Sequence, residues 1–105
     1  MTLGQKQRTF TKNIAILILE AYELGYELTF GDCYRDARCD YGHKQSLHRS
    51  RLAVDLNLFK DGMYLQDNEA NEAHSELHTI WDSFGGAERI DNDLNHYSFS
   101  HNGIR

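Results

Sequence analysis

A histidine and an aspartate in the middle of the chain are the first residues whose types can do chemistry together. His48 lies in a polar, irregular stretch, and Asp55 lies inside the apolar run Ala53-Val54-Asp55-Leu56. An aspartate in a strand that is otherwise apolar needs a partner, because an unpaired buried charge is costly. A metal ion shared with His48 would supply a partner, and so would a buried ion pair of Asp55 with His48, Arg49 or Arg51.

His96 is the candidate third ligand, and Asp93 is the carboxylate that precedes it. On one extended strand these two side chains would point to opposite faces, but the turn-forming residues at 92–95 can bend the chain and bring them together. Two histidines and one aspartate leave the fourth position of a zinc ion open to water, as in catalytic zinc sites. Asp93 is then the carboxylate best placed to accept the proton of that water.

Histidines 74 and 78 are a rival metal pair, because residues four apart on a helix lie on one side of it. Glu76 stands one position too late for the H-E-x-x-H motif of zinc proteases. Both histidines fall on the flank of an apolar stripe, with His78 further out than His74, so we interpret them as residues of a solvated helix flank. His43 and His101 are expected to be exposed.

Two helices that must support these residues are predicted from apolar residues at helical spacing. The first runs from about Phe10, with Thr9 or Thr11 as its cap, to Gly25, and the second from a cap at Asp67 or Asn68 to about residue 84. The predicted buried stripes are Phe10, Ile14, Leu17, Ala21 and Leu24 in the first helix and Ala70, Ala73, Leu77, Ile80, Trp81 and Phe84 in the second.

Strands are predicted at 27–34 with a bulge at Gly31, at 53–60, at 63–65 after an Asp61-Gly62 hairpin turn, and at 96–100. Residues 35–45 are polar and lack periodicity, so they are predicted to form a long loop, a type that is often functional. The order of elements predicts one α+β domain over residues 1–105, with helices packed against a small antiparallel sheet.

The composition narrows the function classes. The chain has 105 residues, a formal net charge of −5 and no block of Lys and Arg longer than two, which disfavours nucleic-acid binding. Cys33 and Cys39 do not have a zinc-ribbon spacing and are expected to be reduced thiols. The longest apolar run, Ile14 to Leu19, is too short to span a bilayer, and the first residues do not form a signal peptide. We therefore expect a monomer made in the cytoplasm that binds neither nucleic acid nor membrane.

The polar residues also resemble the motif of a known family. Zinc D-Ala-D-Ala carboxypeptidases and L-alanyl-D-glutamate peptidases, a family that includes phage endolysins and shares its fold with the hedgehog signalling domain, have a pattern similar to Ser46-x-His48-x6-Asp55 followed by Asp93-x-x-His96. Trp81 and Gly85-Gly86 are similar to the segment before the last motif. The resemblance covers roughly residues 26–99.

The resemblance implies roles for these residues. His48, Asp55 and His96 would bind one zinc ion, and Asp93 would be the general base. Arg35 is similar to the family arginine that holds a substrate carboxylate or a carbonyl oxygen that gains charge. Ser46 would help to position the first ligand or the substrate. The implied activity is hydrolysis of a peptide bond in the peptidoglycan stem peptide by an endolysin that reaches the cell wall after release.

Three positions depart from the family pattern, and two other functions stay open. Arg51 stands where the family has glycine, Asn95 stands where it usually has proline, and Asp93 replaces the Glu of the carboxypeptidase branch, which favours the phage branch.

One alternative function is that of a non-catalytic member that keeps the fold and perhaps the metal and binds a partner. The other is a small metal nuclease, suggested by the His and Asn residues at 92–101 and disfavoured by the acidic charge.

Overall fold

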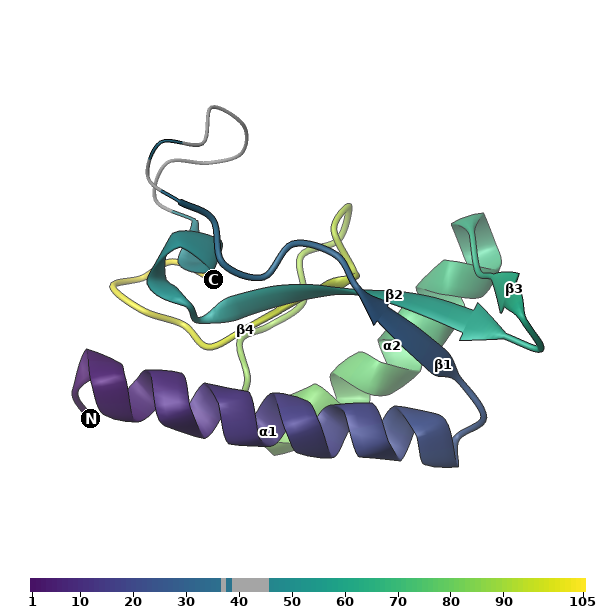
Figure 1. The fold of residues 1–105 in the computed structure, drawn as a ribbon, viewed down its shortest axis with the longest axis horizontal. Coiled ribbons are helices and arrows are strands. Elements are labelled where there is room, and N and C mark those ends of the chain that lie inside the picture. The colour runs from purple at the N-terminus through teal and green to yellow at the C-terminus, as the bar shows by residue number, and fades with distance from the viewer. Residues whose placement is uncertain (37, 39–45) are drawn as a thin grey trace.

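The computed structural model describes residues 1–36, 38 and 46–105. Cys39 and His43 lie outside the described residues, as does most of the loop predicted at 35–45. Within the described part, the chain forms two α-helices, a short 3₁₀ helix and a small antiparallel sheet (Figure 1). The α+β class predicted from the sequence is confirmed.

Helix α1 (Leu3–Glu23) starts earlier than the apolar periodicity predicts, because a capping box holds its first turn. The Thr2 hydroxyl accepts a hydrogen bond from the Gln5 N–H at 3.1 Å, and the Gln5 side chain accepts one from the Thr2 N–H at 2.8 Å. The predicted caps Thr9 and Thr11 therefore lie inside the helix. The buried face is as predicted at Phe10, Ile14, Leu17 and Ala21, whereas Leu24 is an exposed C-cap.

Helix α2 (Asp67–Ser83) follows Gln66, which is its N-cap in place of the predicted Asp67 or Asn68. Of its predicted stripe, Ala73, Leu77 and Trp81 are buried and Ala70, Ile80 and Phe84 are partly buried against the core. Neither α1 nor α2, the two α-helices in the described part of the chain, is both long and apolar enough to cross a membrane.

Strand β2 (Ala53–Lys60) is the centre of the sheet and pairs antiparallel with each of the other strands of the described sheet. Its partners are β1 (Glu27–Phe30), β3 (Met63–Tyr64) and β4 (His96–Ser98). The Asp61-Gly62 turn has φ values of 52° and 77°, the positive values that a type I′ hairpin requires. The hairpin is therefore as predicted, while β1 and β4 are shorter than predicted.

Alternate residues of β2 face two different environments, since side-chain direction alternates along a strand. Val54, Leu56 and Leu58 are buried and join the core with the apolar faces of the helices. In Figure 1, α1 lies below the sheet and α2 runs behind it. Asp55 points to the other face, where its side chain is 19% exposed. Asp55 thus lies in a half-buried strand with buried neighbours, as the sequence indicates, and its own side chain lies on the face away from the core.

The core holds β4 in place through Trp81. The Trp81 indole N–H donates a hydrogen bond to the Ser98 carbonyl at 2.9 Å, and Trp81 is fully buried. Gly86 lies so close to this indole that a Cβ would stand 2.2 Å from Trp81 Nε1, so only glycine fits there. Because β4 carries His96, this contact fixes one side of the candidate site.

Candidate metal centre

The pairing of β2 with β4 places two of the predicted ligands opposite each other. Asp55 and His96 are direct partners in the antiparallel register, and the neighbouring Leu56 N–H donates to the Asn95 carbonyl at 2.9 Å. Directly opposed residues of two antiparallel strands have their side chains on the same face and in contact. The His96 imidazole therefore lies against the Asp55 carboxylate.

His48 reaches the same place from the short 3₁₀ helix η1 (Leu47–Ser50). The Ser46 hydroxyl caps this helix by accepting the His48 N–H at 3.3 Å. The His48 Nδ1–H donates to the Cys33 carbonyl at 2.9 Å, and only a protonated Nδ1 can donate to a carbonyl. In the neutral ring this bond fixes the tautomer and leaves Nε2 unprotonated and able to bind a metal. A hydrogen bond of this kind is the usual outer contact of a histidine ligand.

A bulge brings the chain from β1 over Asp55. The Gly31 N–H donates to the Asp55 carbonyl at 2.8 Å, and the Asp55 N–H donates to the Asp32 carbonyl at 2.8 Å. Two residues thus face one, as in a β-bulge, which explains why β1 ends at Phe30 and agrees with the bulge predicted at Gly31. A Cβ on Gly31 would lie 3.1 Å from the Asp55 Cβ, so glycine allows the close approach that carries Cys33 to His48.

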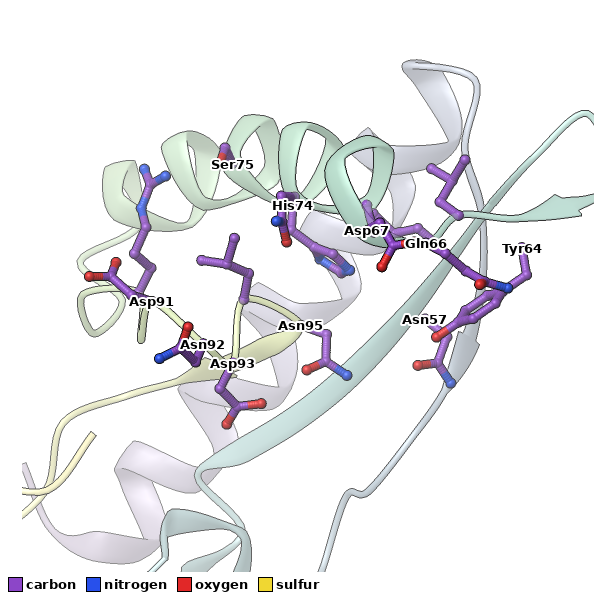
Figure 2. Close-up of a pocket in the computed structure, with 16 residues that line it drawn as sticks. Asn57, Tyr64, Gln66, Asp67, His74, Ser75, Asp91, Asn92, Asp93 and Asn95 are labelled. Atoms are coloured by element: carbon purple, nitrogen blue, oxygen red, sulfur yellow. The ribbon is translucent and has the colours of Figure 1, made fainter.

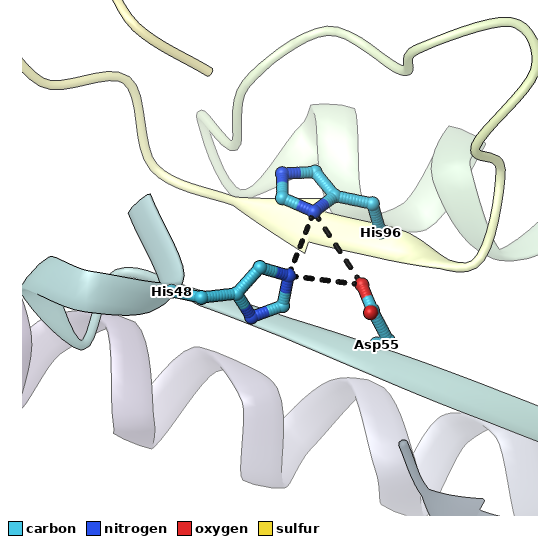
Figure 3. A group of neighbouring side chains, drawn as sticks. All are labelled: His48, Asp55 and His96. Carbon is cyan, nitrogen blue, oxygen red and sulfur yellow. Dashed lines mark hydrogen bonds and ion pairs between the residues drawn. The ribbon is translucent and has the colours of Figure 1, made fainter. Parts of the chain in front are cut away.

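Three donor atoms converge at this place (Figure 3). His48 Nε2 lies 3.2 Å from Asp55 Oδ1 and 3.2 Å from His96 Nδ1, and His96 Nδ1 lies 3.4 Å from Asp55 Oδ1. Zinc bonds of roughly 2.0–2.1 Å at tetrahedral angles place neighbouring ligand atoms about 3.3 Å apart. The triangle therefore has the size of one face of a zinc tetrahedron. Within the described residues these three form the only such group of His, Cys, Asp and Glu side chains.

The bonding and charge of the triangle suit a cation. Asp55 Oδ1 is buried and lacks a hydrogen-bond partner of acceptable geometry among the described residues, although both imidazoles are close. Burial raises the pKa of the Asp55 carboxyl, but the two imidazoles outweigh burial and lower this pKa to about 2. Burial likewise opposes a charge on His48, but the Asp55 carboxylate raises the pKa of His48 overall. The site therefore holds an ionised carboxylate and stabilises positive charge beside it.

Asp93 stands beside the triangle without belonging to it. Its Oδ2 lies 3.9 Å from His96 Nδ1, and its side chain is 51% exposed. The Asp93 N–H donates to the Ile90 carbonyl at 2.9 Å and the His96 N–H donates to the Asp93 carbonyl at 3.1 Å, so the chain bends here. Burial raises the pKa of Asp93, and the charge of Asp55 adds to the rise while that of His96 opposes it.

One pocket of about 470 Å³ contains all six of the predicted site residues, Arg35, Ser46, His48, Asp55, Asp93 and His96. Arg35 is 9% exposed, and its guanidinium donates to the Asp32 carboxylate at 3.0 Å. The pocket also includes Ile90 and residues 103–105, which the sequence did not identify. No spacing or motif marks the latter, because only the fold brings that segment beside the triangle.

Arg51 occupies the position where the family pattern has glycine. It is the C-cap of η1, with φ 56° and ψ 34° in the left-handed region that favours glycine. The turn forms with arginine nevertheless, and the Arg51 guanidinium lies 4.1 Å from the centre of the Tyr34 ring. The departure at this position is therefore accommodated locally.

The prediction of a solvated flank for His74 and His78 is wrong, because Tyr97 of β4 packs over both. His74 is 5% and His78 0% exposed, the reverse of the predicted order. His74 Nδ1 is hydrogen-bonded to the Tyr97 hydroxyl at 2.8 Å, and the His78 ring stacks on the Tyr97 ring at 4.3 Å. Burial lowers the pKa of His74 to about 4 and that of His78 as well. Neither is part of the metal group.

The remaining predicted side chains lie away from the triangle. His101 is half-buried rather than exposed, and its Nδ1 accepts a hydrogen bond from Lys6 Nζ at 3.1 Å. Cys33 is exposed and forms no disulfide within the described residues, which do not include Cys39. Burial and the nearby Asp55 charge raise the pKa of this thiol, which disfavours the thiolate.

No protein-family model matches the chain, and no curated protein matches it. What the site does is therefore inferred from its own residues.

Proposed function

We propose that this protein is a zinc peptidase that hydrolyses a peptide bond in the peptidoglycan stem peptide, as an L-alanyl-D-glutamate endopeptidase or a D-Ala-D-Ala carboxypeptidase. The proposal includes a hedgehog-type fold and a role as a phage endolysin that lyses the host wall. The observation that carries it is the triangle of His48, Asp55 and His96 with Asp93 beside it. These residues stand in the order and spacing of the family motif.

The donor set favours zinc among the metals that a cell supplies. Imidazole nitrogen with one carboxylate oxygen suits zinc and other late first-row metals, whereas magnesium and calcium prefer oxygen alone. Three protein ligands also leave the fourth position open, which distinguishes catalytic from structural zinc sites. The nitrogen and oxygen atoms of His48, Asp55 and His96 match this pattern in type and number.

His48, Asp55 and His96 would hold the zinc ion, which would supply a water whose pKa is about 7 and a Lewis acid that polarises a carbonyl. The Asp93 carboxylate lies close enough to accept the proton of a water in the pocket and to return it to the leaving amine. Its raised pKa suits this role, because proton transfer is most effective when the pKa of the base approaches the working pH.

Arg35 supplies positive charge to the same pocket. Its guanidinium is buried at the pocket wall and is oriented by the Asp32 carboxylate at 3.0 Å. A fixed guanidinium can hold a substrate carboxylate, or the carbonyl oxygen as it gains negative charge. Ser46 acts indirectly, through the cap that orients His48.

Digestion of purified peptidoglycan by the zinc-loaded protein tests the proposal, with mass spectrometry of the products to identify the bond that is cut. Asp93→Asn should keep zinc and lower the rate about 10²- to 10⁴-fold, the usual contribution of a general base. Asp82→Asn, the same change at an exposed position of α2, is the matched control and should cut at the wild-type rate.

Two outcomes would contradict the proposal. Zinc binding without any released peptide would favour the non-catalytic, partner-binding alternative. Cleavage at an unchanged rate in Asp93→Asn would remove that residue from the chemistry.

A further inference from the structure

A second hollow, larger than the metal pocket, adjoins it at Asp93. It has a volume of about 870 Å³ and lies between β2, β3, the start of α2 and the segment at 89–95 (Figure 2). Asp93 lines both hollows, so they are adjacent at the proposed base. The proposed chemistry uses no other residue of this second hollow.

Side-chain carboxamides dominate the polar lining of this hollow, which we call the carboxamide groove. Five of them line it: Asn57, Gln66, Asn71, Asn92 and Asn95. Only that of Asn57 has a hydrogen bond within the described part of the chain, a long one of 3.4 Å from Nδ2 to Thr29 Oγ1. Each carboxamide both donates and accepts, so the groove presents unused hydrogen-bonding groups that match those of a peptide group.

The placement of Asn57 fits an extended peptide. Asp55 and Asn57 lie on the same face of β2, two residues apart, which is about 7 Å along a strand. In an extended ligand, peptide groups on one side of the chain recur at the same interval of about 7 Å. A peptide that passes the triangle at Asp55 and continues along β2 therefore has its next peptide group on that side at Asn57.

Asn95 and Asp93 point in the same direction as Asn57. Figure 2 shows the three side chains extending the same way from β2 and from the segment before β4. The backbone of Asn95 is fixed, since its carbonyl accepts the Leu56 N–H at 2.9 Å. The row of these three side chains leads from the proposed base into the groove.

The charges of the groove restrict the ligand further. Asp67, Asp91 and Asp93 line it with Arg89 as the one arginine, so three carboxylates face one guanidinium. An anionic side chain is disfavoured there by like charge, whereas a neutral or cationic one is not.

We infer that the carboxamide groove binds an extended peptide segment with neutral or cationic side chains, and that Asn57 and Asn95 hold its peptide groups. The inference names a subsite of the proposed peptidase for residues of the stem peptide other than its D-glutamate, and in that respect it rests on the proposed function. Binding of peptide to the groove does not depend on hydrolysis, so the two can fail separately.

NMR titration tests the groove directly, because side-chain NH₂ groups of Asn and Gln give their own ¹H–¹⁵N signals. The zinc-loaded protein is titrated with N-acetyl-tetraalanine amide and with versions that carry a central lysine or a central glutamate. The Asn57 and Asn95 signals should shift, with the lysine and alanine peptides binding more tightly than the glutamate peptide. The Asn13 signal, from α1, should stay in place.

Asn57→Leu keeps the side-chain size and removes the hydrogen bonds, so it should weaken binding of the alanine peptide about 3- to 10-fold. Asn13→Leu is the control and should bind as the wild type does. With peptidoglycan as substrate, Asn57→Leu should raise KM with kcat nearly unchanged, because the lost contact is made equally in ground and transition states.

Each outcome separates the two proposals. Peptide-induced shifts at Asn57 and Asn95, together with no hydrolysis of peptidoglycan, would support the groove and contradict the peptidase. Hydrolysis of peptidoglycan, together with no shift at millimolar peptide and an unchanged KM in Asn57→Leu, would overturn the groove alone. Shifts with chitotriose but not with the peptides would also overturn it, since the groove would then bind a glycan.

Discussion

Strand β4 separates two pairs of buried histidines that differ in what their rings contact. His96 and Tyr97 are adjacent, so their side chains point to opposite faces of the strand. On one face His96 meets His48 and a carboxylate, at 3.2–3.4 Å between the donor atoms. On the other face Tyr97 contacts His74 and His78, each of which has a neutral partner.

The difference shows that burial of an imidazole does not by itself mark a metal site. The His78 Nε2–H donates to the Leu94 carbonyl at 2.7 Å, and His74 is hydrogen-bonded to the Tyr97 hydroxyl, so each ring has one neutral hydrogen-bond partner. The donor atoms of His48 and His96 instead converge on Asp55 Oδ1. Convergence on an ionised carboxylate is what distinguishes the candidate ligands from the structural pair.

Removing one histidine from each pair should give the largest difference in zinc affinity between variants. His48→Ala removes a donor atom, so zinc affinity should fall by more than about 100-fold, the upper end of the cost of losing an outer contact of a metal ligand. His74→Gln retains a partner for the Tyr97 hydroxyl and should change zinc affinity by less than about 10-fold. Competition with a chromophoric chelator measures both, and equal losses in the two variants would contradict the distinction.

Acid should affect His74 and His48, one residue of each pair, in opposite directions in the metal-free protein. The folded-state pKa of His74 is lowered to about 4, so its neutral form is the one compatible with the fold. Between pH 6.5 and 4 the unfolded chain takes up a proton at this residue that the folded chain does not, and stability is lost as pH falls. The loss is on the order of 3 kcal/mol over that window. The pKa of His48 is raised, so its protonation favours the folded chain.

Urea denaturation between pH 7 and 4 measures this contrast. His74→Phe should flatten the acid loss, although its stability at pH 7 is lower because the Tyr97 hydroxyl loses its partner. His48→Ala should steepen the loss. An acid dependence unchanged by His74→Phe would show that His74 is not the residue that titrates.

Arg51→Gly should have the smallest effect. Glycine relieves a left-handed conformation that costs another residue about 1–2 kcal/mol, but it gives up a cation–π contact worth about 0.5–1 kcal/mol and adds backbone entropy to the unfolded chain. The free energy of unfolding should therefore change by less than about 1 kcal/mol, with zinc affinity unchanged. A large drop in zinc affinity would show that the Arg51 side chain supports the site beyond its own turn.

Much of the fold follows from local patterns. The buried faces of both helices and the Asp61-Gly62 hairpin depend on residues close in sequence. Helical periodicity therefore predicts the faces, and the turn residues predict the hairpin. The start of α1 does not, because the Thr2–Gln5 capping box precedes the apolar periodicity. Element ends are set by individual hydrogen bonds of this kind.

In the candidate site, only the residues of the motif are predictable from the sequence. His48, Asp55, Asp93 and His96 were identified by residue type and spacing, but the face on which Asp55 lies depends on which side of β2 the helices cover. The burial of His74 and His78 depends on Tyr97, which lies on another element. The segment at 103–105 enters the pocket through long-range packing that leaves no sequence signal.

X-ray absorption at the zinc edge of the purified, zinc-loaded and dialysed protein tests the central claim most directly. We predict one zinc ion per chain, with nitrogen and oxygen ligands alone at about 2.0–2.1 Å. Asp55→Ala should lose that ion. A protein that retains no zinc after dialysis, or zinc bound through a sulfur at about 2.3 Å, would contradict the assignment of His48, Asp55 and His96 as its ligands.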